Sequence, residues 1–117
     1  DSNLLARARE IEKAMGTRLQ TLAEQSPVVG DVRTTGAIQG VELVMDKESK
    51  SRFSDPREVS AFIGDVGREH GVLLNCQFPH YGNIITMYLP LTITDEELDL
   101  VYDCIEDAVS RVAKTYA

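Results

Sequence analysis

Two apolar segments separated by only four residues place the strongest limit on how this chain can fold. They cover residues 28–32 and 37–45, and the tetrapeptide RTTG at positions 33–36 lies between them. Both segments are rich in valine and other apolar side chains, so each predicts a strand, and the glycine-containing break predicts a turn. Four residues are too few for a parallel crossover, which takes about a dozen or more, so we expect neighbouring antiparallel strands.

Arg33 is the residue of this stretch that needs an explanation. The pattern predicts that it stands at the end of the first strand, beside the turn. A guanidinium there can offer a planar fork of hydrogen-bond donors to the carboxylate of a ligand. An ion pair with the nearby Asp31 explains the same residue without any ligand. Spacing alone leaves both interpretations open.

Helical periodicity is present in three other parts of the chain. Apolar side chains recur every three or four residues over residues 4–23, which predicts an amphipathic helix. Asp55, followed by proline and by glutamate at the third helical position, predicts the start of a second helix that ends at Gly71. A capping box that begins at Thr94 predicts the start of the last helix. His70, at the end of the second helix, is expected to be a charge partner there and not a catalytic base.

Two more strands are predicted in the second half of the chain, over residues 72–76 and 84–89. The connection between them contains Phe78, His80 and Tyr81, which can line a site or pack against another domain. The expected order is helix, strand, strand, helix, strand, strand, helix. Few connections allow a parallel crossover, so we predict a two-layer α+β fold with a mainly antiparallel or mixed four-stranded sheet and helices on one face.

Composition argues against several classes of protein. A chain of 117 residues fits a single domain over residues 1–117, and its 43% apolar and 26% charged residues are ordinary for a globular protein. The net charge of -7 and the lack of a basic stripe argue against nucleic-acid binding. No apolar run approaches the roughly 20 residues needed to span a bilayer, so we expect a cytoplasmic protein without membrane contact.

The sequence contains no recognisable set of catalytic or metal-binding residues. Cys76 and Cys104 lack the spacing of zinc ligands, so we interpret them as buried free thiols in a reducing compartment, with no metal site. The lysines all occur in polar contexts, and the charged residues of the first helix, including Arg7 and Arg18, are expected on a solvated face. Catalytic and cofactor-binding residues are therefore not expected in this chain.

Several short motifs occur in an order that belongs to a known family. VGDVR-x-x-G-x-x-x-G-VELV is followed by EHGVLL at the end of the second helix, then by YGN-II-x-M-x-LPLTIT and by DEELD. Together they resemble the C-terminal small domain of class III pyridoxal-phosphate aminotransferases, of the 4-aminobutyrate, ornithine and ω-amino acid type. The resemblance extends from Leu4 to about Val112. The chain also starts without a methionine, so we expect a C-terminal fragment of a longer enzyme.

The resemblance implies an enzyme of fold type I that moves an amino group from an amino acid or amine to a 2-oxo acid. Pyridoxal 5'-phosphate and the lysine that binds it would belong to a larger domain of the same chain. The full enzyme would be a homodimer, and the fragment alone would be inactive. The family motif also implies that Arg33 binds the carboxylate of the substrate, and that it swings aside when the substrate is a neutral amine.

Two positions depart from the family pattern. Thr34 stands where many relatives have glycine, and Thr86 stands where many have arginine. The amino donor and acceptor therefore stay open. The alternative function is a free-standing α+β module that binds a small molecule and regulates another protein, or an interaction domain.

Overall fold

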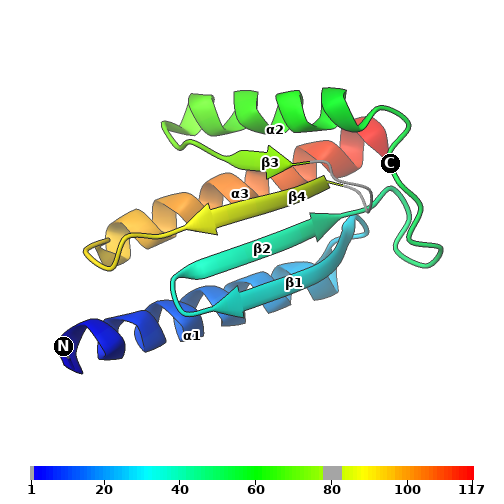
Figure 1. The fold of residues 1–117 in the computed structure, drawn as a ribbon. Coiled ribbons are helices and arrows are strands. Elements are labelled where there is room, and N and C mark those ends of the chain that lie inside the picture. The colour runs from blue at the N-terminus through cyan, green and yellow to red at the C-terminus, as the bar shows by residue number, and fades with distance from the viewer. Residues whose placement is uncertain (1, 78–82) are drawn as a thin grey trace.

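Within residues 2–77 and 83–117, which the computed structural model describes, the chain forms three helices and four strands (Figure 1). In chain order these are α1 (Ser2–Gln25), β1 (Val29–Thr35), β2 (Ile38–Leu43), α2 (Pro56–His70), β3 (Asn75–Gln77), β4 (Asn83–Tyr88) and α3 (Asp95–Tyr116). The predicted order of elements and the predicted α+β fold class are confirmed.

All neighbouring strands of the sheet are antiparallel, and their spatial order is β1-β2-β4-β3. β1 and β2 form a hairpin whose turn contains Gly36, with a φ of 58° in the left-handed region that favours glycine. β2 then pairs with β4, the last strand, and not with β3, which is next in the chain. Of the two predicted sheet types, the antiparallel one is therefore present.

One face of the sheet packs against the helices and forms the core. Val41, Leu43 and Ile85 are fully buried on this face, because side chains alternate between the two faces of a strand. α1 contacts β1 and β2, while α2 contacts β3 and α3. The helices contribute Ile11, Met15 and Leu19 from α1, Ile63 from α2, and Ile105 and Val112 from α3. Figure 1 looks onto the opposite face, which none of the described helices covers.

The largest differences from the predicted strand boundaries are at the end of β1 and at the start of β3. β1 continues through Thr35, so Arg33 lies inside the strand and pairs with Gly40; the prediction that it stands at a strand end was wrong. Thr34 and Thr35 extend the strand because β-branched residues favour extended backbone. β3 begins at Asn75 and not at residue 72, because the preceding residues form the tight exit from α2.

The ends of α2 follow the predicted signals. The amide of Glu58 donates a hydrogen bond to the Asp55 side chain at 3.1 Å, and Gly71, with a φ of 73°, ends the helix. The amide of Val72 then donates to the carbonyl of Gly67 at 2.8 Å. This bond belongs to a Schellman motif, which folds the chain back over the last turn of the helix.

His70 has the predicted role of a charge partner at the end of α2. Its Nε2 lies 2.8 Å from Oδ2 of Asp107 in α3, and Arg111 lies 3.3 Å from the same oxygen. The hydrogen bond with His70 is the main cause that lowers the pKa of Asp107. α2 and α3 are therefore joined by the contact of His70 with Asp107 and by an ion pair of Arg111 with Glu69 at 2.6 Å, as well as by apolar packing.

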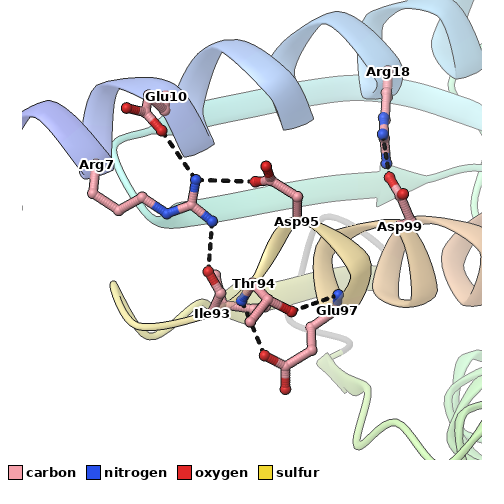
Figure 2. A network of polar contacts seen from close by, with 8 residues as sticks. All are labelled: Arg7, Glu10, Arg18, Ile93, Thr94, Asp95, Glu97 and Asp99. Atoms are coloured by element: carbon pink, nitrogen blue, oxygen red, sulfur yellow. Dashed lines mark hydrogen bonds and ion pairs between the residues drawn. The ribbon is translucent and has the colours of Figure 1, made fainter.

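α1 is joined to the start of α3 by polar contacts that the sequence analysis did not predict (Figure 2). Arg7 was expected on a solvated face, but its guanidinium donates to Asp95 at 3.1 Å and to the carbonyl of Ile93 at 2.5 Å. Arg18 forms an ion pair with Asp99, further along α3. Long arginine side chains can cover apolar surface while their charged ends find distant partners, so a helical pattern alone does not reveal such contacts.

α3 begins with the predicted capping box (Figure 2). The amide of Glu97 donates to Oγ1 of Thr94 at 3.1 Å, and the amide of Thr94 donates to Oε1 of Glu97 at 2.9 Å. The bonds to Thr94 also lower the pKa of Glu97. Two reciprocal hydrogen bonds therefore fix the start of this helix.

The predictions made for the two thiols and for the aromatic connection are confirmed to different extents. Cys104 is fully buried, and burial raises the pKa of its thiol to about 11, whereas Cys76 is only half-buried. The prediction of buried thiols is therefore confirmed for Cys104 and only in part for Cys76. Phe78, His80 and Tyr81 lie outside the described residues, so the prediction for them stays a prediction.

Over the described ranges, no helix has the length and apolarity that a membrane span requires.

Candidate functional site

The face of the sheet that is turned away from the helices, called here the open face, carries Arg33. Arg33 of β1 is the cross-strand partner of Gly40 in β2, and Gly40 is the partner of Thr86 in β4. Directly paired residues of neighbouring strands point to the same face of a sheet. Arg33, Gly40 and Thr86, followed by Asn75 of β3, which pairs with Thr86, therefore form one row across the open face, called here the arginine row.

Asp31, Glu42 and Ile84 form the row beside it. Asp31 and Glu42 are direct cross-strand partners, and two like charges in that arrangement repel each other. Arg33 offsets this repulsion, because its Nε donates to Oδ2 of Asp31 at 3.1 Å. The Arg33 side chain is 84% exposed and that of Asp31 is 46% exposed, so this ion pair is a weak surface contact. The pair with Asp31 that the sequence suggested is therefore present.

Arg33 and Gly40 of the arginine row, the row of Asp31, Glu42 and Ile84, and the loop after β2 line an open hollow of about 690 Å³. Lys50 and Arg52 of that loop line it together with Arg33, so three cations stand beside the carboxylates of Asp31 and Glu42. Lys50 has a φ of 57°, which is uncommon for a residue other than glycine. The lining has one positive charge in excess, and it therefore favours an anionic ligand.

The lysines do not fit a pyridoxal-phosphate site. All four, Lys13, Lys47, Lys50 and Lys114, are at exposed positions. The amine of Lys47 donates to the carbonyls of Ala23 and Ser26 at the end of α1. A lysine that forms an imine with this cofactor is activated by removal from water, which none of these side chains experiences. The open face carries hydrogen-bond donors that suit a carboxylate, and in the isolated chain all four lysines are exposed to water.

The two departures from the family pattern have different surroundings. Thr34 faces α1, since a Cβ built on Gly16 would lie 3.2 Å from its Oγ1. Threonine in place of glycine at this position therefore leaves the open face unchanged. Thr86 lies in the arginine row itself. Its side chain is much shorter than an arginine, and the row continues beside it with Asn75 of β3.

Sequence reasoning found Arg33 but missed Gly40, Lys50 and Arg52. Gly40 could have been singled out from the sequence, because glycine inside a strand lowers stability and often marks a place where another group comes close. Lys50 and Arg52 gave none, because they occur in a polar loop without periodicity. Only the path of that loop brings them to the hollow.

Comparisons with known proteins identify the family. The family model described as Aminotransferase class-III matches residues 1–109. The chain is 37% identical over 100 residues to an adenosylmethionine-8-amino-7-oxononanoate aminotransferase of Geobacter sulfurreducens, which covers 86% of this chain and 21% of the relative. It is 34% identical over 113 residues to a leucine/methionine racemase of Thermococcus litoralis, which covers 96% of this chain and 24% of the relative.

A solved structure supports the same assignment. The fold matches the PMP-bound form of an aminotransferase from Vibrio fluvialis with a TM-score of 0.84 and 26% identity, over 100% of this chain and 25% of that one. The chain thus spans about a quarter of the length of the proteins it resembles. Because the family model covers residues 1–109 and relatives exceed 30% identity over most of the sequence, this chain belongs to the class-III family of pyridoxal-phosphate-dependent aminotransferases.

Proposed function

We propose that this chain is the small, substrate-closing domain of an aminotransferase that transfers an amino group from an amino acid or amine to a 2-oxo acid. Residues 1–117 form a single C-terminal domain in this proposal, and the coverage of only a quarter of related chains supports it. Pyridoxal 5'-phosphate, bound by a larger domain of the same chain, supplies the electron sink for the transfer. The 117-residue chain alone is inactive, because none of its lysines is placed to bind the cofactor.

The exposure of Arg33 is the observation that carries the proposal. Its guanidinium is held only by a weak pair with Asp31 in a hollow with excess positive charge, so a stronger anionic partner can displace that carboxylate. A substrate carboxylate would accept two hydrogen bonds from the guanidinium fork. Such a contact fixes the position of the substrate before it reacts. When the substrate is a neutral amine, the arginine returns to Asp31.

We also assign the open face to the contact with the larger domain. Ile38 and Tyr88 are cross-strand partners on this face, and they remain 49% and 71% exposed. Neighbouring exposed apolar side chains favour burial against another protein surface. Contact at this position would enclose a substrate between the two domains. A homodimer of the full-length enzyme is part of the same proposal.

Replacement of Arg33 in the full-length enzyme tests the assignment. Arg33→Ala should weaken carboxylate-bearing substrates by about 1.5–3 kcal/mol in kcat/KM, the usual worth of a hydrogen bond to a charged group, and should spare neutral amines. Arg68→Ala is the matched control, because Arg68 is also an exposed arginine paired with a neighbouring aspartate, but on α2. Unchanged kinetics with carboxylate substrates would remove Arg33 from the site.

The upstream reading frame tests the proposal as a whole. It should encode a few hundred further residues that include a cofactor-binding lysine. A frame that begins near Asp1 would instead support the alternative of a free-standing binding or interaction module. The family match disfavours that alternative.

Racemisation is the second candidate reaction, and the similarity to the leucine/methionine racemase favours it. The two reactions have different products. Incubation of the full-length enzyme with one enantiomer of an amino acid, with and without a 2-oxo acid, distinguishes them. Loss of the amino group only in the presence of the oxo acid indicates aminotransfer, whereas formation of the opposite enantiomer without it indicates racemisation.

A further inference from the structure

The fold itself does not require glycine at position 40. A Cβ built on Gly40 would meet no heavy atom within 4 Å, and its backbone lies outside the left-handed region. Gly30 and Gly67, in contrast, lie where no side chain fits. A Cβ on Gly30 would lie 3.1 Å from a methyl group of Val44, and one on Gly67 would lie 2.5 Å from the carbonyl oxygen of Val72.

A glycine inside a strand lowers stability, so its presence calls for a cause. Such glycines occur at bulges, at sharp bends, or where a ligand or another backbone comes close. The register shift between β1 and β2 lies between Val29 and Asp31, and the pairing of β2 with β4 is regular through Gly40. A bulge therefore does not explain Gly40, and close approach of another group from the open face does.

We propose that Gly40 is a specificity-determining residue that sets how large a carboxylate-bearing substrate the open face can accept. Gly40 lies between Arg33 and Thr86 in the arginine row, and it lines the hollow. Neighbouring strands are about 4.8 Å apart, so Arg33 and Thr86 are separated by roughly 10 Å of backbone distance. Without a side chain at position 40, the space between them is free for the part of the substrate that adjoins its carboxylate.

A side chain at position 40 would project into the middle of this space. Beyond it the row continues with the short side chains of Thr86 and Asn75, so position 40 lies next to Arg33 and decides how much room remains beside its guanidinium. The inference rests on the proposed function, because it takes the open face as the substrate side of the domain. In this inference Gly40 selects substrates by size, in addition to the selection by charge that we propose for Arg33.

The experiment uses Gly40→Ala and Gly40→Val in the full-length enzyme. Calorimetry measures the dissociation constants of two unreactive carboxylates, propanoate and 4-methylpentanoate, and kinetics measures kcat/KM for pyruvate and 4-methyl-2-oxopentanoate. We expect values close to wild type for the small ligand of each pair. For the bulky ligand, affinity and kcat/KM should fall from wild type to Gly40→Ala and again to Gly40→Val. The loss for Gly40→Val should be about 10-fold or more, because the pocket then has no room for the extra methyl groups.

Gly64→Ala is the matched control for the loss of a glycine. A Cβ there would meet only the end of the Arg68 side chain, at 3.8 Å, and α2 packs against the core face of the sheet, opposite to the arginine row. This variant should leave the affinities for small and bulky ligands unchanged.

Two results would overturn the inference. An equal loss of affinity for small and bulky carboxylates would show that the group approaching Gly40 is the backbone of the larger domain. Unchanged affinities for both would show that nothing approaches it. Arg33→Ala tests the proposed function separately: if it leaves carboxylate binding intact, the anchoring role fails, whereas the size dependence of the Gly40 variants can still be present.

Discussion

Replacement of Gly67 by alanine should destabilise the chain, although alanine is the better helix former. A Cβ at this position would lie 2.5 Å from the carbonyl oxygen of Val72 and 3.2 Å from Cγ of Leu74. Both contacts are shorter than ordinary van der Waals distances, and the first is to backbone, which cannot rotate away. The chain after α2 would have to move outward from the helix to admit the methyl group.

The expected magnitude follows from two opposing effects. Overpacking of a close contact costs about 1–3 kcal/mol, and the same movement stretches the 2.8 Å hydrogen bond from the Val72 amide to the Gly67 carbonyl. The change from glycine to alanine inside a helix stabilises the folded chain by roughly 0.5–1 kcal/mol. Gly67→Ala should therefore lower the free energy of unfolding by about 1–2 kcal/mol.

Gly64→Ala supplies the control on the same helix. Its added Cβ meets nothing closer than 3.8 Å, so only the helix-propensity effect remains. The free energy of unfolding of that variant should be higher than wild type by roughly 0.5–1 kcal/mol. Urea unfolding of the 117-residue chain, followed by circular dichroism, gives both values. Changes in stability of the same sign and similar size for the two variants would contradict a clash at position 67.

Two further variants test the helix ends. Thr94→Ala removes one half of the capping box and should cost about 1 kcal/mol in urea unfolding, whereas Thr94→Ser should keep most of the stability; equal losses would argue against the cap. Asp107→Asn should flatten the pH dependence of stability in acid. The pKa of Asp107 is lowered in the folded chain, so its contribution is complete above the ordinary value of 3.8 and is lost as the pH falls through the lower folded value. Unfolding curves between about pH 6 and pH 2 check this, and identical slopes for both proteins would contradict it.

Local signals predicted the helices well. Asp55 and Thr94 are hydrogen-bond acceptors that fix a helix start within a few residues, and Gly71 supplies the left-handed backbone that ends α2. Such effects depend on neighbours in the chain, so they are visible in sequence. Arg7 shows the limit of this reasoning, because its partner Asp95 is brought close only by the packing of α1 on α3.

The candidate site was only partly predictable for a related reason. Arg33 was found from its motif, but its place inside β1 depended on how far the strand continues past it. The strand register determines its cross-strand neighbours, and the path of the loop after β2 determines the neighbours Lys50 and Arg52. Gly40 could have been singled out as a glycine within a strand, whereas nothing local connects Arg33 with Thr86.

The order of strands in the sheet also has a consequence for how the molecule folds. The hairpin of β1 and β2 closes through a two-residue turn, so Arg33 and Gly40 can meet early by a local step. Thr86 reaches Gly40 only when the whole of α2 and β3 has been looped out between β2 and β4, which carries a larger entropy of closure. The row is thus completed by the slowest kind of contact in this topology. Nascent or partly unfolded chains would carry Arg33 before the other strands of its row are in place.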